Sequence, residues 1–323
     1  MCAIIFIIKG KKTTVSTFLR SLISIKPTPC CHALLHLCTM KLPPALQPGD
    51  TIGLAAPSRF INEDQIRDIA EFFASKGFQT YVDPALTCRH FQFAGTDQER
   101  ANLFNRLIHH PEVKAIWCMR GGYGAGRILP LIDFNFLASN PKWVLGFSDI
   151  TAIHSALLRH NVACIHAPLA TTLAKAPQEA INRCFDILSG EVNENLHPLP
   201  LNEARARVVG GNLSVIASLM GTPWFEIQQG DILLLEDIDE MLYHIDRMMN
   251  NLSLSGALQK VSAIWVGYFS QMRDSTKDFG FSSDNPFGMD ALQIVKSHAA
   301  VFNIPCFEVP VGHEDANYPV ILG

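Results

Sequence analysis

Apolar residues occur along this chain in two alternating patterns. Short continuous runs fit strands buried on both faces of a sheet, and runs spaced by three or four positions fit helices with one buried face. Strands that alternate with helices in this way predict an α/β fold with a doubly wound, mostly parallel sheet. Strands are expected at 51–58, 78–82, 115–119, 143–145 and 163–166, and then, in a second unit that opens at 208–212, at 232–235, 262–269 and 306–311.

Helices are expected between these strands, and several of their ends carry recognisable signals. Asn62 is a good N-cap, and Gly77 closes the helix that follows it. Thr96 and Glu99 form a capping box, and Pro111 stops that helix. Further helices are expected at 149–158, 178–189, 241–254 and 289–299, and in the stretch that ends at Met220.

The chain of 323 residues is long enough for two domains. Its best linker runs from Gly190 to Arg205, which is polar and is interrupted by Pro198 and Pro200. The expected division is an N-terminal α/β domain at 40–190, a linker at 191–205 and a smaller C-terminal α/β domain at 206–323.

Residues 1–39 differ in composition from everything after them. They contain no Asp or Glu, five Lys or Arg, and four of the nine cysteines. The apolar run precedes the positive charges, which argues against a secretory signal and leaves a transit peptide or translation from an upstream start. We favour an upstream start with Met40 as the working initiator, so residues 1–39 are not expected to be part of the fold.

The other end of the chain stops in an apolar run, Val320–Leu322. This pattern predicts that the second domain is truncated and lacks its final strand. A missing strand would leave an unpaired apolar edge in that domain, which lowers stability.

Composition narrows the class of partner. A formal net charge of −4 argues against nucleic acid, and no apolar run approaches the ~20 residues that span a bilayer. The five cysteines after Met40 are scattered and odd in number, which predicts free thiols, mostly buried, and a cytoplasmic location. No Cys-x-x-Cys or His-Glu-x-x-His pattern suggests a metal, and no other cofactor is expected. A homodimer is left open.

A serine, Ser148, lies between a predicted strand and a predicted helix. The strand is Trp143–Leu145, Gly146 opens the turn, and the helix begins at Asp149. A serine on such a turn exposes its hydroxyl as a nucleophile and lets the next amide face a developing oxyanion. The alternative is that Ser148 or Asp149 is only the N-cap of the helix, and this stretch alone favours a cap.

A glycine-rich stretch, 120–126, follows the third predicted strand and reads Arg-Gly-Gly-Tyr-Gly-Ala-Gly. Its backbone amides can approach a ligand closely and point at negative charge. The spacing does not match G-x-G-x-x-G, and a tight turn that needs glycine is the alternative interpretation. In a parallel sheet this loop and Ser148 emerge at the same carboxyl edge, where ligands bind.

Two more groups follow buried strands in the second unit. Glu236 closes one strand and is placed to orient a histidine, whereas Asp237 and Asp239 are better placed as caps of the next helix. His313 follows the last predicted strand. Ser148, Glu236 and His313 therefore come in the serine–acid–histidine order of the α/β-hydrolase type of triad. Three coincident strand ends favour a nucleophilic serine over a helix cap.

These motifs together resemble the LD-carboxypeptidases, a family of serine peptidases that includes murein tetrapeptide carboxypeptidases and microcin-immunity peptidases. The resemblance covers about 46–323 and departs from the family at Ala167, where glycine is usual, and at the end of the chain, where the family continues. The residues that carry it are Pro48-Gly49-Asp50, Ala56-Pro57-Ser58, Ala94-Gly95-Thr96-Asp97, Glu99-Arg100, Arg120-Gly121-Gly122-Tyr123-Gly124, Gly146-Phe147-Ser148-Asp149-Ile150-Thr151, Gly210-Gly211-Asn212-Leu213, Glu236-Asp237, Ile245-Asp246-Arg247 and Pro310-Val311-Gly312-His313.

The resemblance implies a catalytic site at the interface of two domains. Ser148 would be the nucleophile, His313 the general base and Glu236 the carboxylate that orients it. The amides of Asp149 and of a glycine in the pair 121–122 would form the oxyanion hole, so Gly121 and Gly122 are both candidates.

A substrate with a terminal carboxylate calls for a cation, and an arginine fork suits a carboxylate best. Arg120 and Tyr123 in the glycine-rich stretch are the candidate substrate contacts. For Arg120 the alternative is an exposed, solubilising arginine.

The implied reaction is hydrolysis of the bond between an L-configured centre, meso-diaminopimelate or lysine, and terminal D-alanine in cytoplasmic muropeptides, as in peptidoglycan recycling. The partner would be a small peptide, and no cofactor would take part. An alternative within the family is microcin-immunity-like hydrolysis of peptidyl or aminoacyl nucleotides. An alternative of another class is a non-catalytic protein that binds an anion or a peptide with the glycine-rich loop.

Overall fold

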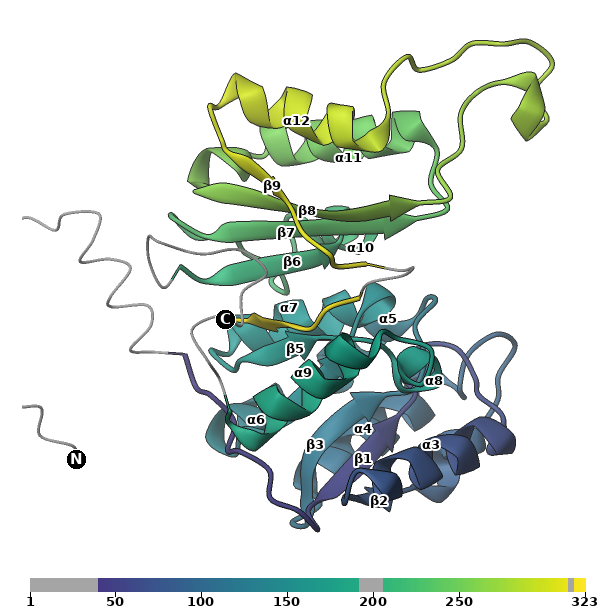
Figure 1. The fold of residues 1–323 in the computed structure, drawn as a ribbon, viewed down its shortest axis with the longest axis vertical. Coiled ribbons are helices and arrows are strands. Elements are labelled where there is room, and N and C mark those ends of the chain that lie inside the picture. The colour runs from purple at the N-terminus through teal and green to yellow at the C-terminus, as the bar shows by residue number, and fades with distance from the viewer. Residues whose placement is uncertain (1–39, 192–205, 313–316) are drawn as a thin grey trace, which may run out of the picture.

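The computed structural model describes residues 40–191, 206–312 and 317–323, which form two α/β units, one above the other (Figure 1). Each unit has its own sheet with helices packed against it. The predicted α/β class with a mostly parallel sheet is confirmed. The leader at 1–39 and almost all of the predicted linker lie outside the described residues.

The first unit contains a six-stranded sheet in the order β10-β5-β4-β3-β1-β2. Strands β1 to β5 are parallel to their neighbours in the sheet, and β10 runs antiparallel to β5. Most of the central strands are buried on both faces, as their continuous apolar runs require. The strands are β1 (Thr51–Ala55), β2 (Gln79–Tyr81), β3 (Val113–Cys118), β4 (Trp143–Gly146), β5 (Cys164–His166) and β10 (Val320–Leu322).

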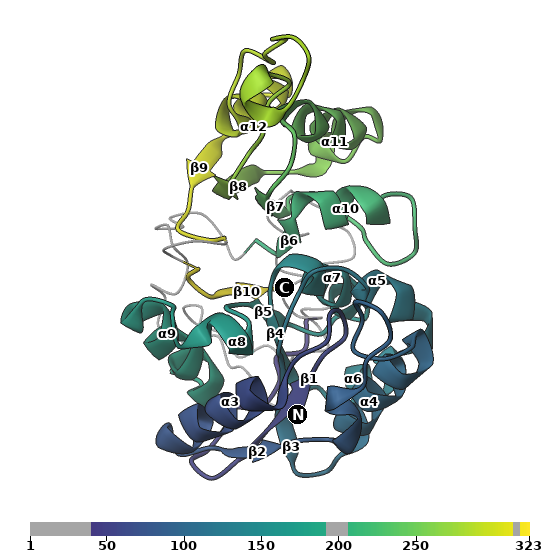
Figure 2. The same ribbon diagram turned by 90° about the vertical axis from the view of Figure 1, so that its right-hand side faces the viewer.

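Helices cover both faces of this sheet, with α3, α8 and α9 on one side and α4, α5, α6 and α7 on the other (Figure 2). Asn62 is the N-cap of α3, and Thr96 opens α4 with a capping box, as the sequence predicts; a capping box at Asn62 was not predicted. The short α5, α6 and α8 were not expected. The helices are α3 (Glu63–Ser75), α4 (Asp97–His109), α5 (Ala125–Ile128), α6 (Phe134–Ser139), α7 (Thr151–Arg159), α8 (Ala170–Leu173) and α9 (Gln178–Ser189).

The second unit has a four-stranded parallel sheet in the order β6-β7-β8-β9. Its helices α11 and α12 lie side by side on the sheet (Figure 1). The elements are β6 (Val208–Asn212), α10 (Leu213–Leu219), β7 (Ile232–Ile238), α11 (Leu242–Leu254), β8 (Ala263–Ser270), α12 (Ala291–Val301) and β9 (Cys306–Glu308).

The last strand, β10, crosses from the second unit back to the first. Val320 pairs with His166 and Leu322 pairs with Cys164, and both apolar side chains are buried. The Gly323 amide then donates to the Val208 carbonyl at 3.0 Å. The prediction that placed 320–322 in the C-terminal domain is therefore wrong, because this strand joins the sheet of the first unit. The pattern predicts a strand but not its partner, and the antiparallel partner lies in the other sheet.

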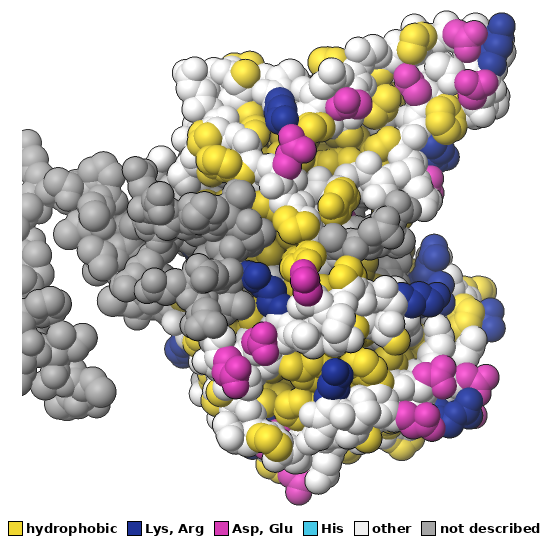
Figure 3. Space-filling model, viewed as in Figure 1, with side chains coloured by type: hydrophobic (Ala, Val, Ile, Leu, Met, Phe, Trp, Pro, Cys, Tyr) yellow, Lys and Arg dark blue, Asp and Glu magenta, His cyan; other side chains and the backbone are white. Residues whose placement is uncertain are grey.

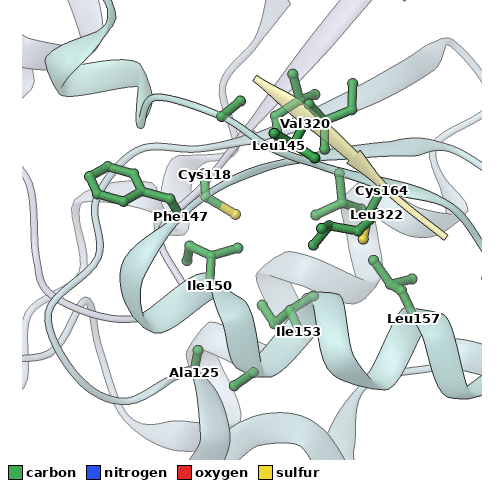
Figure 4. Packing of buried hydrophobic residues seen from close by; sticks show 14 of the residues in the cluster. Cys118, Ala125, Leu145, Phe147, Ile150, Ile153, Leu157, Cys164, Val320 and Leu322 are labelled. Atoms are coloured by element: carbon green, nitrogen blue, oxygen red, sulfur yellow. The ribbon is translucent and has the colours of Figure 1, made fainter. Parts of the chain in front are cut away.

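The core of the first unit reaches from the sheet to α7 and β10. Ile150, Ile153 and Leu157 line one side of α7 and face Leu145 of the sheet and Leu322 of β10 (Figure 4). The packing thus fixes the 3₁₀ turn Ser148–Ile150, which leads into α7, against the middle of the sheet.

The distribution of surface charge and the state of the cysteines can be compared with what the sequence predicts. Acidic and basic side chains are interspersed over both units on the face in Figure 3. The described cysteines are free, and those at 118, 164 and 184 are buried, whereas those at 88 and 306 are partly exposed. Among the described helices, none has the length and apolar character needed to cross a membrane.

Candidate active site

Ser148 lies on a strained turn between β4 and α7. Its φ is 60°, in the left-handed region that non-glycine residues seldom adopt. Neither the 3₁₀ turn Ser148–Ile150 nor α7 has a side-chain capping bond at its start. The cap interpretation of Ser148 is therefore wrong, and the backbone strain matches the turn of a nucleophilic serine.

Asp149 is not a cap either, because its carboxylate reaches across to two other segments. Its Oδ2 accepts hydrogen bonds from Ser58 Oγ at 2.5 Å and from the Ala125 amide at 2.8 Å. Burial raises the pKa of Asp149, and these two hydrogen bonds oppose that shift. Asp149 thus ties the serine turn to the end of the glycine-rich stretch.

The glycine-rich stretch passes directly beside Ser148. A Cβ on Gly121 would lie 3.2 Å from Ser148 Cβ and 3.3 Å from Ser148 Oγ, so a larger residue would press on the hydroxyl. Gly122 and Gly124 have φ of 113° and 135°, which side chains rarely tolerate. The loop needs its glycines both as a turn and as a close approach to Ser148.

Arg100 holds this loop through hydrogen bonds, a role that the sequence did not reveal. Its side chain is fully buried and donates to the carbonyls of Gly124, at 2.9 Å, and Pro57. It also pairs with Asp97. The Ala94–Arg100 motif, which was only a mark of resemblance, therefore holds the loop in place.

Glu236 lies at an irregularity between β7 and β8. Leu235 pairs with Val266 and Asp237 with Phe269, so Glu236 faces two residues of β8, as in a bulge. Only 1% of Glu236 is exposed, and neither carboxylate oxygen has a hydrogen-bond partner among the described residues. Bulges often aim a side chain at an active site.

The pKa of Glu236 reflects its burial without a facing cation among the described residues. Burial raises its pKa to about 8, the Asp237 carboxylate adds to the shift, and the neighbouring Asn212 amide opposes it. An ionised carboxylate in such a place costs several kcal/mol unless a cation or donors face it. The site is therefore suited to a histidine that takes up a proton.

Asp237 has a different role from the predicted one. It was expected to cap the following helix, but α11 begins at an N-cap, Met241, without a side-chain bond. Instead the Asp237 carboxylate accepts from Asn212 Nδ2 at 2.9 Å and from the Ser214 amide at 2.8 Å. It therefore holds the start of α10 and the amide of Asn212 beside Glu236.

Asn212 connects the two halves of the site. It pairs with Glu236 across the sheet, and its backbone amide donates to Thr151 Oγ1 at 3.1 Å, one turn after Ser148. A Cβ on Gly211 would lie 2.6 Å from the same Oγ1, so the units touch here without room for a side chain. Ser148 and Glu236 thus lie on facing edges of the two units.

His313 lies outside the described residues, and the described residues before it lie beside Glu236. A Cβ on Gly267 would lie 2.3 Å from the Val311 carbonyl and 3.2 Å from Glu236 Cβ, so both flank one backbone position. The Gly312 amide donates to Asn317 Oδ1 at 3.2 Å. Val311 and Gly312, the last two described residues before His313, therefore lie on the same side of β8 as Glu236.

The glycine-rich stretch itself contains Arg120 and Tyr123, and a second arginine lies over it. Arg120 is partly buried at the end of β3, and Tyr123 is 54% exposed with its ring 6.1 Å from that of Phe93. Arg59, which the sequence did not single out, is exposed and lies over Gly122. Its position comes from a loop after β1, and no local pattern marks it.

Comparison with known proteins covers nearly all of the described chain. Residues 52–167 match the model of the LD-carboxypeptidase N-terminal domain, and residues 205–323 match that of the C-terminal domain. The murein tetrapeptide carboxypeptidase of Pseudomonas aeruginosa is 30% identical over 290 residues, 84% of this chain and 91% of that protein. The microcin C7 self-immunity protein of Escherichia coli is 28% identical, over 68% of this chain and 75% of that protein.

The fold has a close match among solved structures. The crystal structure of muramoyltetrapeptide carboxypeptidase from Oxalobacter formigenes superimposes with a TM-score of 0.72 at 26% identity. The match covers 84% of this chain and 92% of that protein. The two units and their arrangement are therefore those of a known two-domain enzyme fold.

Proposed function

We propose that this chain, which belongs to the LD-carboxypeptidase family, removes terminal D-alanine from muropeptides in the cytoplasm. The family establishes the coarser statement that the chain is a hydrolase and a carboxypeptidase of the serine type. The proposal adds the bond, which joins an L-configured centre, meso-diaminopimelate or lysine, to D-alanine. It also adds the context, the recycling of peptidoglycan.

The observation that carries the proposal is the strained Ser148 turn beside Gly121. Ser148 has a φ of 60°, and a Cβ on the neighbouring Gly121 would lie 3.3 Å from its hydroxyl oxygen. In this proposal, the backbone amides of Asp149 and of Gly121 or Gly122 donate to the oxyanion. Preorganised amides of this kind stabilise the tetrahedral intermediate without a metal or a cofactor.

The proposed reaction proceeds in two steps. His313 takes the proton of Ser148 Oγ as the oxygen attacks the carbonyl carbon before D-alanine, and Glu236 stabilises the imidazolium that forms. The C–N bond then breaks, and His313 gives its proton to the leaving amine of D-alanine. Water, activated in the same way, hydrolyses the acyl-enzyme and frees Ser148.

The carboxylate of Glu236 supports this assignment of roles. Burial raises the pKa of Glu236 to about 8, so the neutral acid is favoured at neutral pH when no cation faces it. An imidazolium beside it restores the ionised form, which is the state needed to stabilise the positive charge on His313. Arg120 and Tyr123 remain proposed contacts to the substrate on the other side of Ser148.

The test is a comparison of substrates. We expect the protein to release D-alanine from the murein tetrapeptide that carries meso-diaminopimelate or lysine, and Ser148→Ala to abolish the release. The same assay is run with an aminoacyl nucleotide, because a microcin self-immunity protein is among the relatives. Preferential hydrolysis of the nucleotide, with no D-alanine released, would overturn the muropeptide proposal.

A further inference from the structure

A carboxypeptidase that releases one residue must hold the terminal carboxylate close to its nucleophile. Consecutive Cα atoms are about 3.8 Å apart, so the carboxylate lies roughly one residue beyond the bond that is cut. A carboxylate taken from water needs a cation or several donors at that place. The anchor should therefore be a cation one residue away from the oxyanion hole.

Arg59 is fixed at that place from two directions. Its preceding residue, Ser58, donates to the carboxylate of Asp149, the residue after the nucleophile, at 2.5 Å. Its own side chain covers Gly122, where a Cβ would lie 2.6 Å from Cδ and 2.8 Å from Nε of Arg59. Gly122 directly follows Gly121, whose Cβ position contacts Ser148.

The backbone of Arg59 is held by hydrogen bonds while its side chain is exposed. Arg59 bridges Phe93 in antiparallel fashion, and the Phe60 amide donates to the Gln92 carbonyl at 3.2 Å. The side chain itself is exposed at the surface of the site. A fixed base with an accessible guanidinium is the arrangement that a substrate anchor requires.

Arg59 also lacks an ion-pair partner within the described residues, in contrast to other arginines of the first unit. Arg100 and Arg127 pair with Asp97, and Arg106 pairs with Asp83. The carboxylate that feels the charge of Arg59 is Asp149, which is buried and already holds two hydrogen bonds. The guanidinium of Arg59 is therefore free to take an external carboxylate.

We infer that Arg59 binds the terminal carboxylate of the substrate and so makes the enzyme an exopeptidase. The inference rests on the proposed function for the position of the cut, but not for the identity of the D-alanine. It assigns to Arg59 the role for which Arg120 was the candidate in the sequence. Gly122 then has a second reason to be glycine, since any side chain would push Arg59 away.

The test measures binding rather than turnover, in a Ser148→Ala background. The probes are N-acetyl-L-lysyl-D-alanine and its C-terminal amide, and the readout is the ratio of their dissociation constants by calorimetry. We expect the parent to bind the acid roughly 10- to 100-fold more tightly, the scale of a charge-assisted hydrogen bond. Arg59→Met should bring this ratio near one.

A second arginine variant serves as the matched control. Arg89 lies nearby with its guanidinium 3.8 Å from the centre of the Phe60 ring, and Arg89→Met should keep the parent ratio. A parent that does not distinguish acid from amide, or an acid preference that survives Arg59→Met, would overturn the inference.

The outcome is separable from that of the proposed function. Failure of the wild-type protein to release D-alanine from the tetrapeptide refutes the muropeptide proposal. An acid preference that depends on Arg59 would still support the anchor in that case. Release of D-alanine together with a ratio that ignores Arg59 would keep the proposed function and refute the anchor.

Discussion

Two buried histidines of the first unit contrast with two buried carboxyls of the second. In the first unit, His154 and His166 are completely buried, and burial lowers the pKa of each to about 3. In the second unit, burial raises the pKa of Glu236 to about 8 and that of Asp237 to about 6. The two histidines therefore resist the uptake of a proton, and the two carboxyls resist its loss.

The difference shows how each unit serves the site. In the proposed mechanism the first unit offers the nucleophile, which backbone geometry holds in place. The second unit offers a carboxylate that reaches its working charge only when an imidazolium faces it. The complete site therefore needs both units, and each unit can be perturbed separately.

The largest expected effect comes from the nucleophile. Ser148→Ala should reduce kcat/KM by roughly 10⁴-fold or more, because the covalent step is lost. The melting temperature should stay close to that of the wild type, since the side chain makes no capping bond. The matched control is Ser155→Ala on the helix that follows, whose hydroxyl bonds to the Thr151 carbonyl, and it should retain activity. Activity of Ser148→Ala within about tenfold of wild type would make this turn merely structural.

Glu236→Gln tests the contribution of the carboxylate in the second unit. Loss of the charge that stabilises an imidazolium should lower kcat by roughly 10²- to 10⁴-fold with little change in KM. Since a raised carboxyl pKa makes folding less favourable as pH rises from about 4.5 to about 8, the variant should lose this pH dependence. Urea unfolding at several pH values measures it. Glu240→Gln is the control, because Glu240 pairs with His244 away from the sheet. A fully active Glu236→Gln protein would remove Glu236 from the mechanism.

Acid should destabilise the first unit through its buried histidines. The unfolded chain binds protons below pH 6.5, but His154 and His166 do not until about pH 3. The free energy of unfolding should therefore fall as the pH drops below 6.5, by up to about 1.4 kcal/mol per pH unit for each histidine. His166→Leu should weaken this dependence, and the exposed His109→Leu should not. Identical acid unfolding of both variants and wild type would refute the contrast between the units.

A smaller effect is expected where the units touch. Thr151→Val removes the oxygen that accepts the Asn212 amide, leaving a buried donor unpaired at a cost of about 1–3 kcal/mol. Catalysis should fall with it, because the same bond sets Glu236 against Ser148. Thr172→Val, whose hydroxyl bonds within its own turn, is the control. Equal thermal stability and equal rates for the two variants would show that this contact does not align the site.

The smallest expected effect is that of the leader. Translation from Met40 should give the same melting temperature and the same rates as the full chain, because the basic composition of 1–39 breaks sharply at that residue. A loss of folded protein on this deletion alone would mean that the leader belongs to the first unit.

Local patterns predicted most of the fold because they report on burial and on chain ends. The N-cap at Asn62, the capping box at Thr96 and the strand before Ser148 lie where the sequence places them. The strand expected to end before Glu236 runs on through it to Ile238. The serine turn was also recognisable, since an apolar run, a glycine and a helix follow one another in the sequence.

Contacts between distant segments could not be predicted in the same way. The pairing of β10 with β5 joins residues more than 150 positions apart, and an apolar triplet carries no sign of its partner. Arg59 and the buried Arg100 act through loops that meet only after folding. Asp237 looked like a cap for the next helix, but a strand neighbour, Asn212, and the start of α10 competed for it.

The position of β10 has a consequence for how the protein is made. A ribosome synthesises the whole second unit before it adds the strand that pairs with β5. Until then the first unit has an open edge at Cys164–His166, and open edges invite pairing with other chains. The nascent chain therefore keeps this edge uncovered while all residues between His166 and Val320 are made. The first sheet gains its sixth strand only in this late step, so we expect chains that stop before β10 to be prone to aggregate.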